Sequence, residues 1–233
     1  MKAKHFHNWQ ITPREARQKQ LEMAAMVSKR NEVNDVHLIA GVDISAPDTT
    51  GIARAAVVVI SYPELETSEV KVIKHQVTFP YVPGLLSFRE APLILAACDE
   101  LDSEPDLILV DGQGIAHPRR LGLASHLGII WDKPTIGCAK SRLCGKHDLV
   151  PLEKGSYAEI TDNGEVIGAA LRTKHGVSPI YVSIGHKVDL QAAIAWALRC
   201  CCGFRIPEPT RLAHLAAGKQ PEAVLSNEIK SSI

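Results

Sequence analysis

The stretch DVHLIAGVDISAPDTTGIARAAVVVISY, residues 35–62, contains two apolar runs that are rich in β-branched residues. Such residues pack well on a pleated surface, so 35–45 and 53–62 are predicted to form buried strands. The segment 46–52 between them carries Pro, Asp and Gly, which are typical of turns. Residues 68–79 alternate and predict a third strand, so the sheet is expected to begin as a three-strand meander.

Helices and further strands are predicted on both sides of this meander. Thr12 is a suitable N-cap, with a proline after it and Glu15 three residues on, so a helix is expected from there to about Arg30. After the meander the pattern predicts a helix at 86–101 capped by Ser87, a strand at 105–111, a helix at 119–130, a strand at 133–140, a polar loop, strands at 165–173 and 179–186, and a helix at 188–203.

Three meandering strands followed by parallel crossovers predict a mixed α/β sheet flanked by helices. The doubly wound pattern differs, because it alternates from its first strand. A chain of 233 residues suits a single domain over 1–233, with loose ends at 1–10 and 220–233.

The composition is that of an ordinary globular protein, with 45% hydrophobic residues, 22% charged residues and a mean hydropathy of zero. No run approaches the roughly 20 apolar residues that a membrane span needs, and residues 1–18 lack the apolar core of a secretory signal. The six cysteines form no CxxC pair, which argues against a zinc cage or a disulfide framework. We therefore expect a monomeric, cytoplasmic protein with reduced thiols and no membrane partner.

The charge is balanced overall but uneven along the chain. Twenty-six basic residues match twenty-six acidic ones, which counts against a protein that coats nucleic acid nonspecifically. Between His117 and His147 the only acid is Asp132, and the basic residues are Arg119, Arg120, Lys133, Lys140, Arg142 and Lys146. This basic segment is either a face that meets phosphates or a solvated surface.

Two acids stand at the ends of predicted strands. Asp43 ends the apolar run LIAGVD and Asp111 ends LILVD, and either one alone is typically a cap or a turn former. The meander can place these strands side by side, and Glu90 from the helix between them makes three carboxylates that can converge. Crowded carboxylates resist joint ionisation unless a cation compensates them, and hard oxygen ligands favour Mg²⁺. The pattern therefore indicates metal-assisted hydrolysis of a phosphodiester.

Two further stretches carry glycines or prolines and allow more than one interpretation. In DGQGIAHPRR, residues 111–120, a dinucleotide-binding fingerprint fails because His117 stands where a third glycine is required. Gly112 and Gly114 then mark either a close approach of backbone to a ligand or a tight turn. The tip, residues 80–83 (PYVP), presents its tyrosine on a stiff backbone, which serves either packing or insertion.

Six motifs together resemble the endonuclease V family. They are GVD at 41–43, PYVPGLLSFRE at 80–90, VDGQGIAHPRRLGLASHLG at 110–128, PTIGCAKSRLCG at 134–145, YVSIGHKVDL at 181–190 and RIPEPTRLAH at 205–214. They occur in the expected order over nearly the whole chain, from Asp43 to His214. The resemblance implies a ribonuclease H-like fold and a deoxyinosine-directed nuclease of DNA repair.

The resemblance also implies roles for matching positions. The metal-binding carboxylates would be Asp43, Glu90 and Asp111. Lys140 would lie against the phosphate at the cut, and His214 would be a further catalytic residue. The tip would be a wedge that props the strands apart at the lesion, through Pro80, Tyr81, Val82 and Pro83. The pocket for the extruded hypoxanthine would be bordered by Gly84, Leu86, Gly112, Gly114 and Leu123. Gln113 departs from the histidine that bacterial members commonly carry there, which bears on the choice between DNA and RNA.

By the same resemblance the enzyme would use Mg²⁺, with Mn²⁺ able to substitute. It would cut inosine-containing DNA at the second phosphodiester on the 3′ side of the lesion, leaving 3′-hydroxyl and 5′-phosphate ends. Two alternatives stay open, an inosine-directed endoribonuclease and a lesion-binding protein with no hydrolytic role. The converging acids argue against the second alternative, because a protein that only binds has no use for them.

Overall fold

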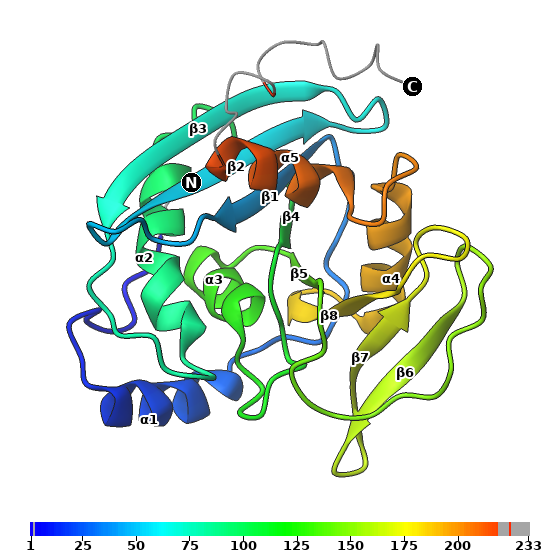
Figure 1. The fold of residues 1–233 in the computed structure, drawn as a ribbon, viewed down its shortest axis with the longest axis horizontal. Helices are drawn as coiled ribbons and strands as arrows, with labels where there is room; N and C mark the ends of the chain where they lie inside the picture. Colours follow the sequence, from blue (N-terminus) through cyan, green and yellow to red (C-terminus); the bar gives the residue numbers. More distant parts are fainter. Residues whose placement is uncertain (2, 219–223, 225–233) are drawn as a thin grey trace.

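An eight-stranded mixed sheet forms the centre of the part of the chain that the computed structural model describes, residues 1, 3–218 and 224 (Figure 1). The strands lie in the order β3-β2-β1-β4-β5-β8-β7-β6. Their bounds are β1 Leu38–Ile44, β2 Ile52–Ser61, β3 Thr67–Gln76, β4 Leu107–Val110, β5 Thr135–Ala139, β6 Tyr157–Asp162, β7 Glu165–Leu171 and β8 Ile180–His186.

The first three strands form the predicted meander. β1 pairs antiparallel with β2, and β2 pairs antiparallel with β3. On its other side β1 pairs parallel with β4, and β4 pairs parallel with β5, which requires a crossover before each of these strands. β8, β7 and β6 then extend the sheet with antiparallel pairs. This order confirms the predicted mixed α/β sheet.

Helices cover both faces of the sheet (Figure 1). Successive side chains of a strand point to opposite faces: Ala40 and Val42 of β1 share a core with α2 and α3, whereas Ile39 shares a core with α4 and α5. Burial on both faces explains why β1 and β2 carry continuous apolar runs. The helices are α1 Pro13–Ala24, α2 Leu86–Asp99, α3 Leu123–Trp131, α4 Leu190–Arg199 and α5 Glu208–Ala217.

α1 begins at the predicted position but ends earlier. The Thr12 side chain accepts a hydrogen bond from the Glu15 amide, and the Glu15 carboxylate accepts one from the Thr12 amide, which confirms the capping box. The helix ends at Ala24, several residues before its predicted end. The amide of Ser28 donates to His186 Nδ1 at 3.1 Å, so this segment leaves the helix to bond with the end of β8.

Two other helices begin differently from the prediction. Ser87 lies inside α2 and makes no capping bond; the N-cap is Leu85. The turn after the tip leads directly into the helix, because the Leu85 amide donates to the Val82 carbonyl at 2.9 Å. α3 begins at Leu123, later than predicted, because Arg120 has a φ of 56°, in the left-handed region that a right-handed helix excludes.

The apolar pattern does not predict β6 or α5. β6 is an edge strand with mostly exposed side chains, so it lacks an apolar run. Its signal is the pair Asn163-Gly164, whose φ values of 51° and 79° are typical of a tight hairpin turn into β7. The signal for α5 is Pro207 followed by an acid, Glu208, in the first turn.

The N-terminal segment, expected to be loose, packs against α3. The Lys4 amide donates to the Ile130 carbonyl at 2.8 Å. His7 is buried, and its Nε2 atom lies 2.8 Å from Nε2 of His126. The other expected loose end, 220–233, lies almost entirely outside the described residues.

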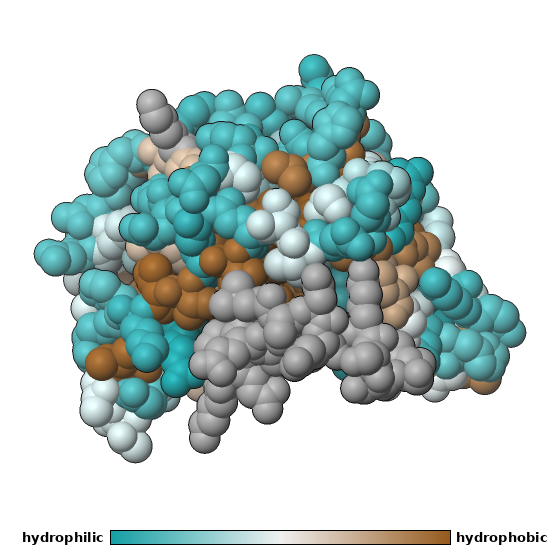
Figure 2. Space-filling view, turned by 90° about the horizontal axis from the view of Figure 1, so that it is seen from above, coloured by the Kyte–Doolittle hydropathy of each residue, from teal (hydrophilic) through white to brown (hydrophobic). Residues whose placement is uncertain are grey.

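The surface seen from the top of Figure 1 is hydrophilic around its rim, with hydrophobic side chains near its middle (Figure 2). Scattered apolar side chains are normal on a protein surface. Within the described part of the chain, no helix has the length and apolar character to cross a membrane.

Candidate active site

Asp43 and Asp111 meet at the carboxyl ends of two neighbouring strands. Asp43 lies near the end of β1, and Asp111 directly follows β4. Parallel pairing places Val42 beside Val110, and the Asp111 amide donates to the Val42 carbonyl at 3.2 Å. The structure therefore brings together the two acids that the sequence places at strand ends.

A close approach of two backbones brings α5 to the same place. A Cβ atom added to Gly41 would lie 2.0 Å from the carbonyl oxygen of Pro209, so glycine is what lets α5 pack this closely on β1. Farther along α5, His214 reaches the centre, and its Nδ1 atom lies 2.6 Å from Asp43 Oδ2. The glycine of the GVD motif thus positions the histidine of RIPEPTRLAH.

Lys140, which follows β5, completes the group. Its Nζ atom forms an ion pair with Asp111 Oδ2 at 2.5 Å and lies 3.4 Å from His214 Nδ1. Because that nitrogen is much closer to the Asp43 carboxylate, we assign its ring proton to Nδ1, where it is donated to Asp43. The ammonium group therefore compensates the charge of Asp111, and the imidazole donates a hydrogen bond to Asp43.

The carboxyl groups at this centre are hard to ionise together. Burial and the charge of Asp111 raise the pKa of Asp43, while hydrogen bonds from His214 and from the Ile44 amide act to lower it. Burial, followed by the charges of Asp43 and Asp111, raises the pKa of Glu90 to about 8. Such perturbed carboxyl groups mark a place where added positive charge is favourable.

The donors at this centre suit a hard divalent cation. Carboxylate oxygens of Asp43 and Asp111 and a ring nitrogen of His214 lie within 4.8 Å of one another, which the described residues repeat nowhere else. Glu90, the third predicted metal ligand, lies outside this group of three but is close enough to respond to both acids. Carboxylate oxygens are the donors that Mg²⁺ prefers in proteins.

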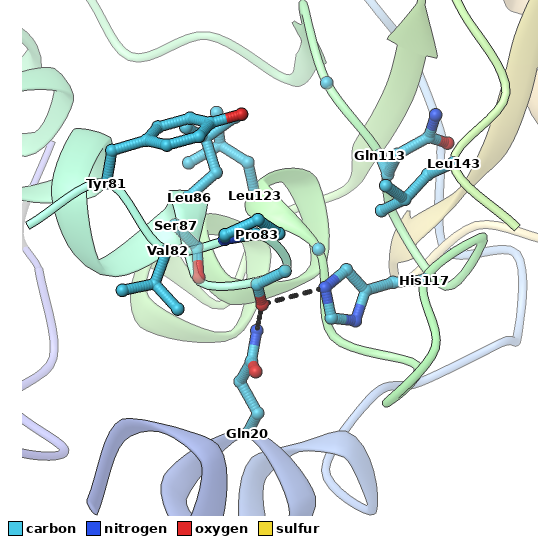
Figure 3. A pocket seen from close by; sticks show the side chains of 13 residues that line it. Gln20, Tyr81, Val82, Pro83, Leu86, Ser87, Gln113, His117, Leu123 and Leu143 are labelled. Carbon is cyan, nitrogen blue, oxygen red and sulfur yellow. Dashed lines mark hydrogen bonds between the residues drawn. The ribbon is translucent and has the colours of Figure 1, made fainter. Parts of the chain in front are cut away.

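A cavity of about 170 Å³ lies beside the tip (Figure 3). One wall comes from the tip and the start of α2, and the other comes from the loop after β4 and the start of α3. The volume is several times the roughly 30 Å³ of a water molecule but below the ~300 Å³ of pockets for drug-sized ligands. It therefore suits a single flat ring system. Four residues predicted to border a base pocket line it: Gly84, Leu86, Gly112 and Leu123.

Gly114, the fifth residue predicted to border the pocket, does not line this cavity. A Cβ atom added there would lie 1.9 Å from the carbonyl oxygen of Ile184 in β8, and its amide donates to Ser183 Oγ at 2.8 Å. Glycine at this position is thus required by packing against β8. At Gly112 an added Cβ atom would instead lie 3.4 Å from the side chain of Leu123, at the cavity wall.

The tip is exposed at its tyrosine and anchored at its base. Tyr81 is 72% exposed, so its ring does not pack in the core and is accessible to a ligand. The carbonyl of Gly84, directly after the tip, accepts hydrogen bonds from Gln20 Nε2 and His117 Nε2, each at 3.0 Å (Figure 3). It also accepts one from Arg119 Nη2 at 2.6 Å. The tip is therefore held by side chains from other parts of the fold.

Sequence reasoning gave no role to His117 or Gln20 at this site. His117 Nδ1 accepts from the Arg119 amide at 3.1 Å, so the ring carries its proton on Nε2 and is neutral. Burial, with the nearby Arg119 charge, lowers the pKa of His117 to about 4, which keeps this neutral form. The signal for Gln20 is its polar character at the middle of the buried face of α1, between Ala16 and Met23.

Half of the six basic residues of the basic segment pair with acids from elsewhere in the fold, and one of these pairs is Lys140 with Asp111. Arg120 pairs with Asp162 and Glu165 at 3.0 and 2.6 Å, and Lys133 pairs with Glu104 at 2.9 Å. These ion pairs reduce the positive charge that the segment presents to phosphates.

Two acids lie at the ends of neighbouring central strands, and a helix places a histidine beside them. On a mixed α/β sheet, this arrangement is typical of an enzyme that cleaves phosphodiesters. The sheet and its flanking helices are those of the ribonuclease H-like fold. The fold and the site together define the protein as a ribonuclease H-like nuclease.

Comparison with known proteins narrows this class to one family. A family model described as Endonuclease V matches residues 21–215. An Endonuclease V of Dehalococcoides mccartyi is 50% identical over 219 residues, which cover 94% of this chain and 98% of that protein. The crystal structure of an Endonuclease V from Streptomyces avermitilis has a TM-score of 0.87 and 38% identity, and the match covers 97% of this chain and 100% of that one.

A further match is an Endonuclease V of Ciona intestinalis, solved in complex with a 24mer DNA that contains an inosine followed by a ribo-adenosine. It has a TM-score of 0.77 and 28% identity, and the match covers 91% of this chain and 98% of that one. The chain belongs to the Endonuclease V family, a family of nucleases.

Proposed function

We propose that this enzyme is a metal-dependent endonuclease of DNA repair that recognises deoxyinosine. It hydrolyses the second phosphodiester on the 3′ side of the lesion and leaves 3′-hydroxyl and 5′-phosphate ends. Family membership supports this proposal, as does the relative bound to inosine-containing DNA. The observation that carries it is the group formed by Asp43, Asp111 and His214 next to a base-sized cavity, since Gly112 of the cavity wall directly follows Asp111.

Asp43, Asp111 and Glu90 would hold Mg²⁺, or Mn²⁺ in its place, and the bound ion would stabilise charge on the phosphodiester in the transition state. Lys140, compensated by Asp111 in this structure, would then be available to contact the phosphate at the cut. His214 is oriented by Asp43 through Nδ1, so its Nε2 atom is the one that would exchange a proton with a reacting group.

Recognition would use the tip and the cavity. Tyr81 would enter the base stack at the lesion, and the extruded hypoxanthine would occupy the cavity beside it. Two polar atoms of lining residues, Ser87 Oγ and Gln113 Oε1, are buried with no hydrogen-bond partner in the described structure. Buried polar groups are normally paired, which supports a ligand with a polar edge.

The enzyme would act as a monomer in a reducing compartment, the cytoplasm. None of the six cysteines forms a disulfide in the described residues, which supports a compartment that keeps thiols reduced.

Two other functions are distinguishable from this one. An inosine-directed endoribonuclease would use the same centre and pocket, and only the choice of sugar would differ. A lesion-binding protein with no hydrolytic role would gain nothing from placing two mutually repelling acids, Asp43 and Asp111, side by side.

The test incubates the protein with matched DNA and RNA oligonucleotides, each with one inosine or with adenine at that position, in Mg²⁺ or in EDTA. We expect a single cut in inosine-containing DNA in Mg²⁺, mapped to the second phosphodiester, and none in EDTA. Cleavage of the RNA alone would support the ribonuclease, and binding without cleavage in Mg²⁺ would support the lesion-binding protein.

A further inference from the structure

Gln20 of α1 joins segments that lie on opposite sides of the cavity (Figure 3). The residue is 1% exposed. Its Nε2 atom donates to the carbonyls of Gly84 and Leu121, each at 3.0 Å, and its Oε1 atom accepts from Arg119 Nε at 2.5 Å. Two acceptors face the amide nitrogen and one donor faces the amide oxygen, so the orientation of this amide is determined by its partners.

The helix that carries Gln20 spans both walls of the cavity. Ala16, Gln20 and Met23 form the buried face of α1, as their spacing in a helix requires. Ala16 packs in one cluster with Phe79, directly before the tip. Met23 packs in a separate cluster with Leu121, in the loop between β4 and α3. Gln20 therefore lies between two apolar contacts, one to each wall.

A buried amide with all its groups paired is often no more than a well-satisfied core residue. Gln20 differs because its two acceptors belong to different walls, Gly84 to the tip wall and Leu121 to the loop wall. Its own side chain lines the cavity between them. Two direct bonds also join the walls, from His117 and Arg119 to the Gly84 carbonyl, and Gln20 orients the second of these donors by accepting from Arg119 Nε. Gln20 therefore contributes to the separation of the walls, and hence to the width of the cavity, through all three of its hydrogen bonds.

We propose that Gln20 is a positioning residue for base recognition, which sets the separation between the tip and the loop 117–122 so that the extruded base fits. This inference rests on the proposed recognition of inosine. Gln20 contacts none of Asp43, Asp111, Lys140 or His214 through a hydrogen bond in the described structure. Its loss therefore affects the binding of the lesion and leaves the hydrolysis of bound DNA nearly unchanged.

The test compares Gln20→Met, Gln20→Glu and Gln18→Met in cleavage of inosine-containing DNA. Methionine fills similar space without hydrogen bonds, and glutamate keeps an acceptor for Arg119 but cannot donate to the two carbonyls. We expect KM to rise about tenfold for Gln20→Met, because the walls are held less firmly at the width that fits the base; tenfold corresponds to about 1.4 kcal/mol. The rise should be larger for Gln20→Glu, because its carboxylate would face two carbonyl oxygens. Gln18 is the matched control, because it is an exposed glutamine on the same helix that bonds Glu22.

Single-turnover rates at saturating DNA should change by less than about twofold in both Gln20 variants, on the same energy scale. All variants are measured below their melting temperatures. A lower melting temperature with an unchanged KM would make Gln20 a structural residue only, and an equal loss in the saturated rate would place it in the chemistry; either result overturns the inference. If the wild-type protein itself does not distinguish inosine from adenine, the proposed function fails first.

Discussion

At the scale of single residues, each of the two acids at the centre is paired with a group from elsewhere in the chain. Asp43 accepts a hydrogen bond from His214, and Asp111 forms an ion pair with Lys140. The two acids can be predicted from the sequence, because each ends an apolar run. These pairings cannot be predicted from periodicity, since His214 and Lys140 come from elements more than 25 residues away from either acid in the chain.

Lys140→Ala tests the lysine at this centre. The change removes the cation that faces Asp111, so it should slow cleavage at saturating DNA as well as weaken binding. Arg119→Ala is the comparison, because Arg119 bonds Gly84 and Gln20 and should act on affinity alone. The measurement is single-turnover cleavage alongside binding for both variants. Equal effects, confined to affinity, would remove Lys140 from the catalytic set.

At the scale of elements, the tip is stiff by its sequence and fixed in place by its surroundings. Pro80 and Pro83 limit the backbone, as the sequence predicts. The bonds that hold Gly84 come from Gln20, His117 and Arg119, which are distant in the chain and are brought to the tip only by the packing of α1 and the loop before α3. A pattern of local residues cannot show such a contact.

Tyr81→Ala tests insertion of the tip into the base stack. Stacking on an aromatic ring is worth about 1–3 kcal/mol per base, so inosine-DNA binding should weaken by roughly one to two orders of magnitude. Tyr81→Phe should bind almost as well as the wild type, because stacking needs the ring and not the hydroxyl. The exposed ring predicts little change in melting temperature for either variant. A destabilised Tyr81→Ala with normal affinity would end the wedge hypothesis.

At the scale of the whole molecule, the sequence predicts seven of the eight strands, the edge strand β3 included, but it predicts neither the other edge strand, β6, nor the helix α5. The meander and the parallel crossovers follow from apolar runs that are buried on both faces. The apolar pattern does not predict β6, because an edge strand needs few apolar side chains. The packing of α5 depends on the close approach of its backbone to Gly41. Only the packed chain shows that this approach brings His214 to Asp43.

Buried histidines make the stability of the whole fold depend on pH. Burial lowers the pKa of His126 to about 3 and of His117 to about 4, from an unfolded value near 6.5. Below about pH 6.5 the unfolded chain binds protons that the folded chain cannot, so these groups reduce the free energy of unfolding as the pH falls. Glu90 acts in the opposite direction, because its folded pKa of about 8 is raised and its contribution is lost as the pH rises.

The measurement that separates these contributions is urea unfolding of the wild type and of His126→Gln between pH 7 and pH 4.5. The wild type should lose up to about 1.4 kcal/mol more per pH unit than the variant as the pH falls. His75→Gln is the control, because this histidine is exposed, and it should keep the wild-type slope. Equal slopes in the wild type and His126→Gln would contradict the assignment.

In the proposed function, the molecule binds the lesion at the tip and the cavity and cuts the strand at the centre formed by Asp43, Asp111 and His214. Asp111→Asn tests this proposal most directly, with binding and cleavage of inosine-containing DNA measured on the same variant in Mg²⁺. Binding should persist, because less negative charge faces the phosphates and the cavity is untouched, while cleavage should fall by orders of magnitude with the metal site impaired. Cleavage by Asp111→Asn at near the wild-type rate would contradict the account.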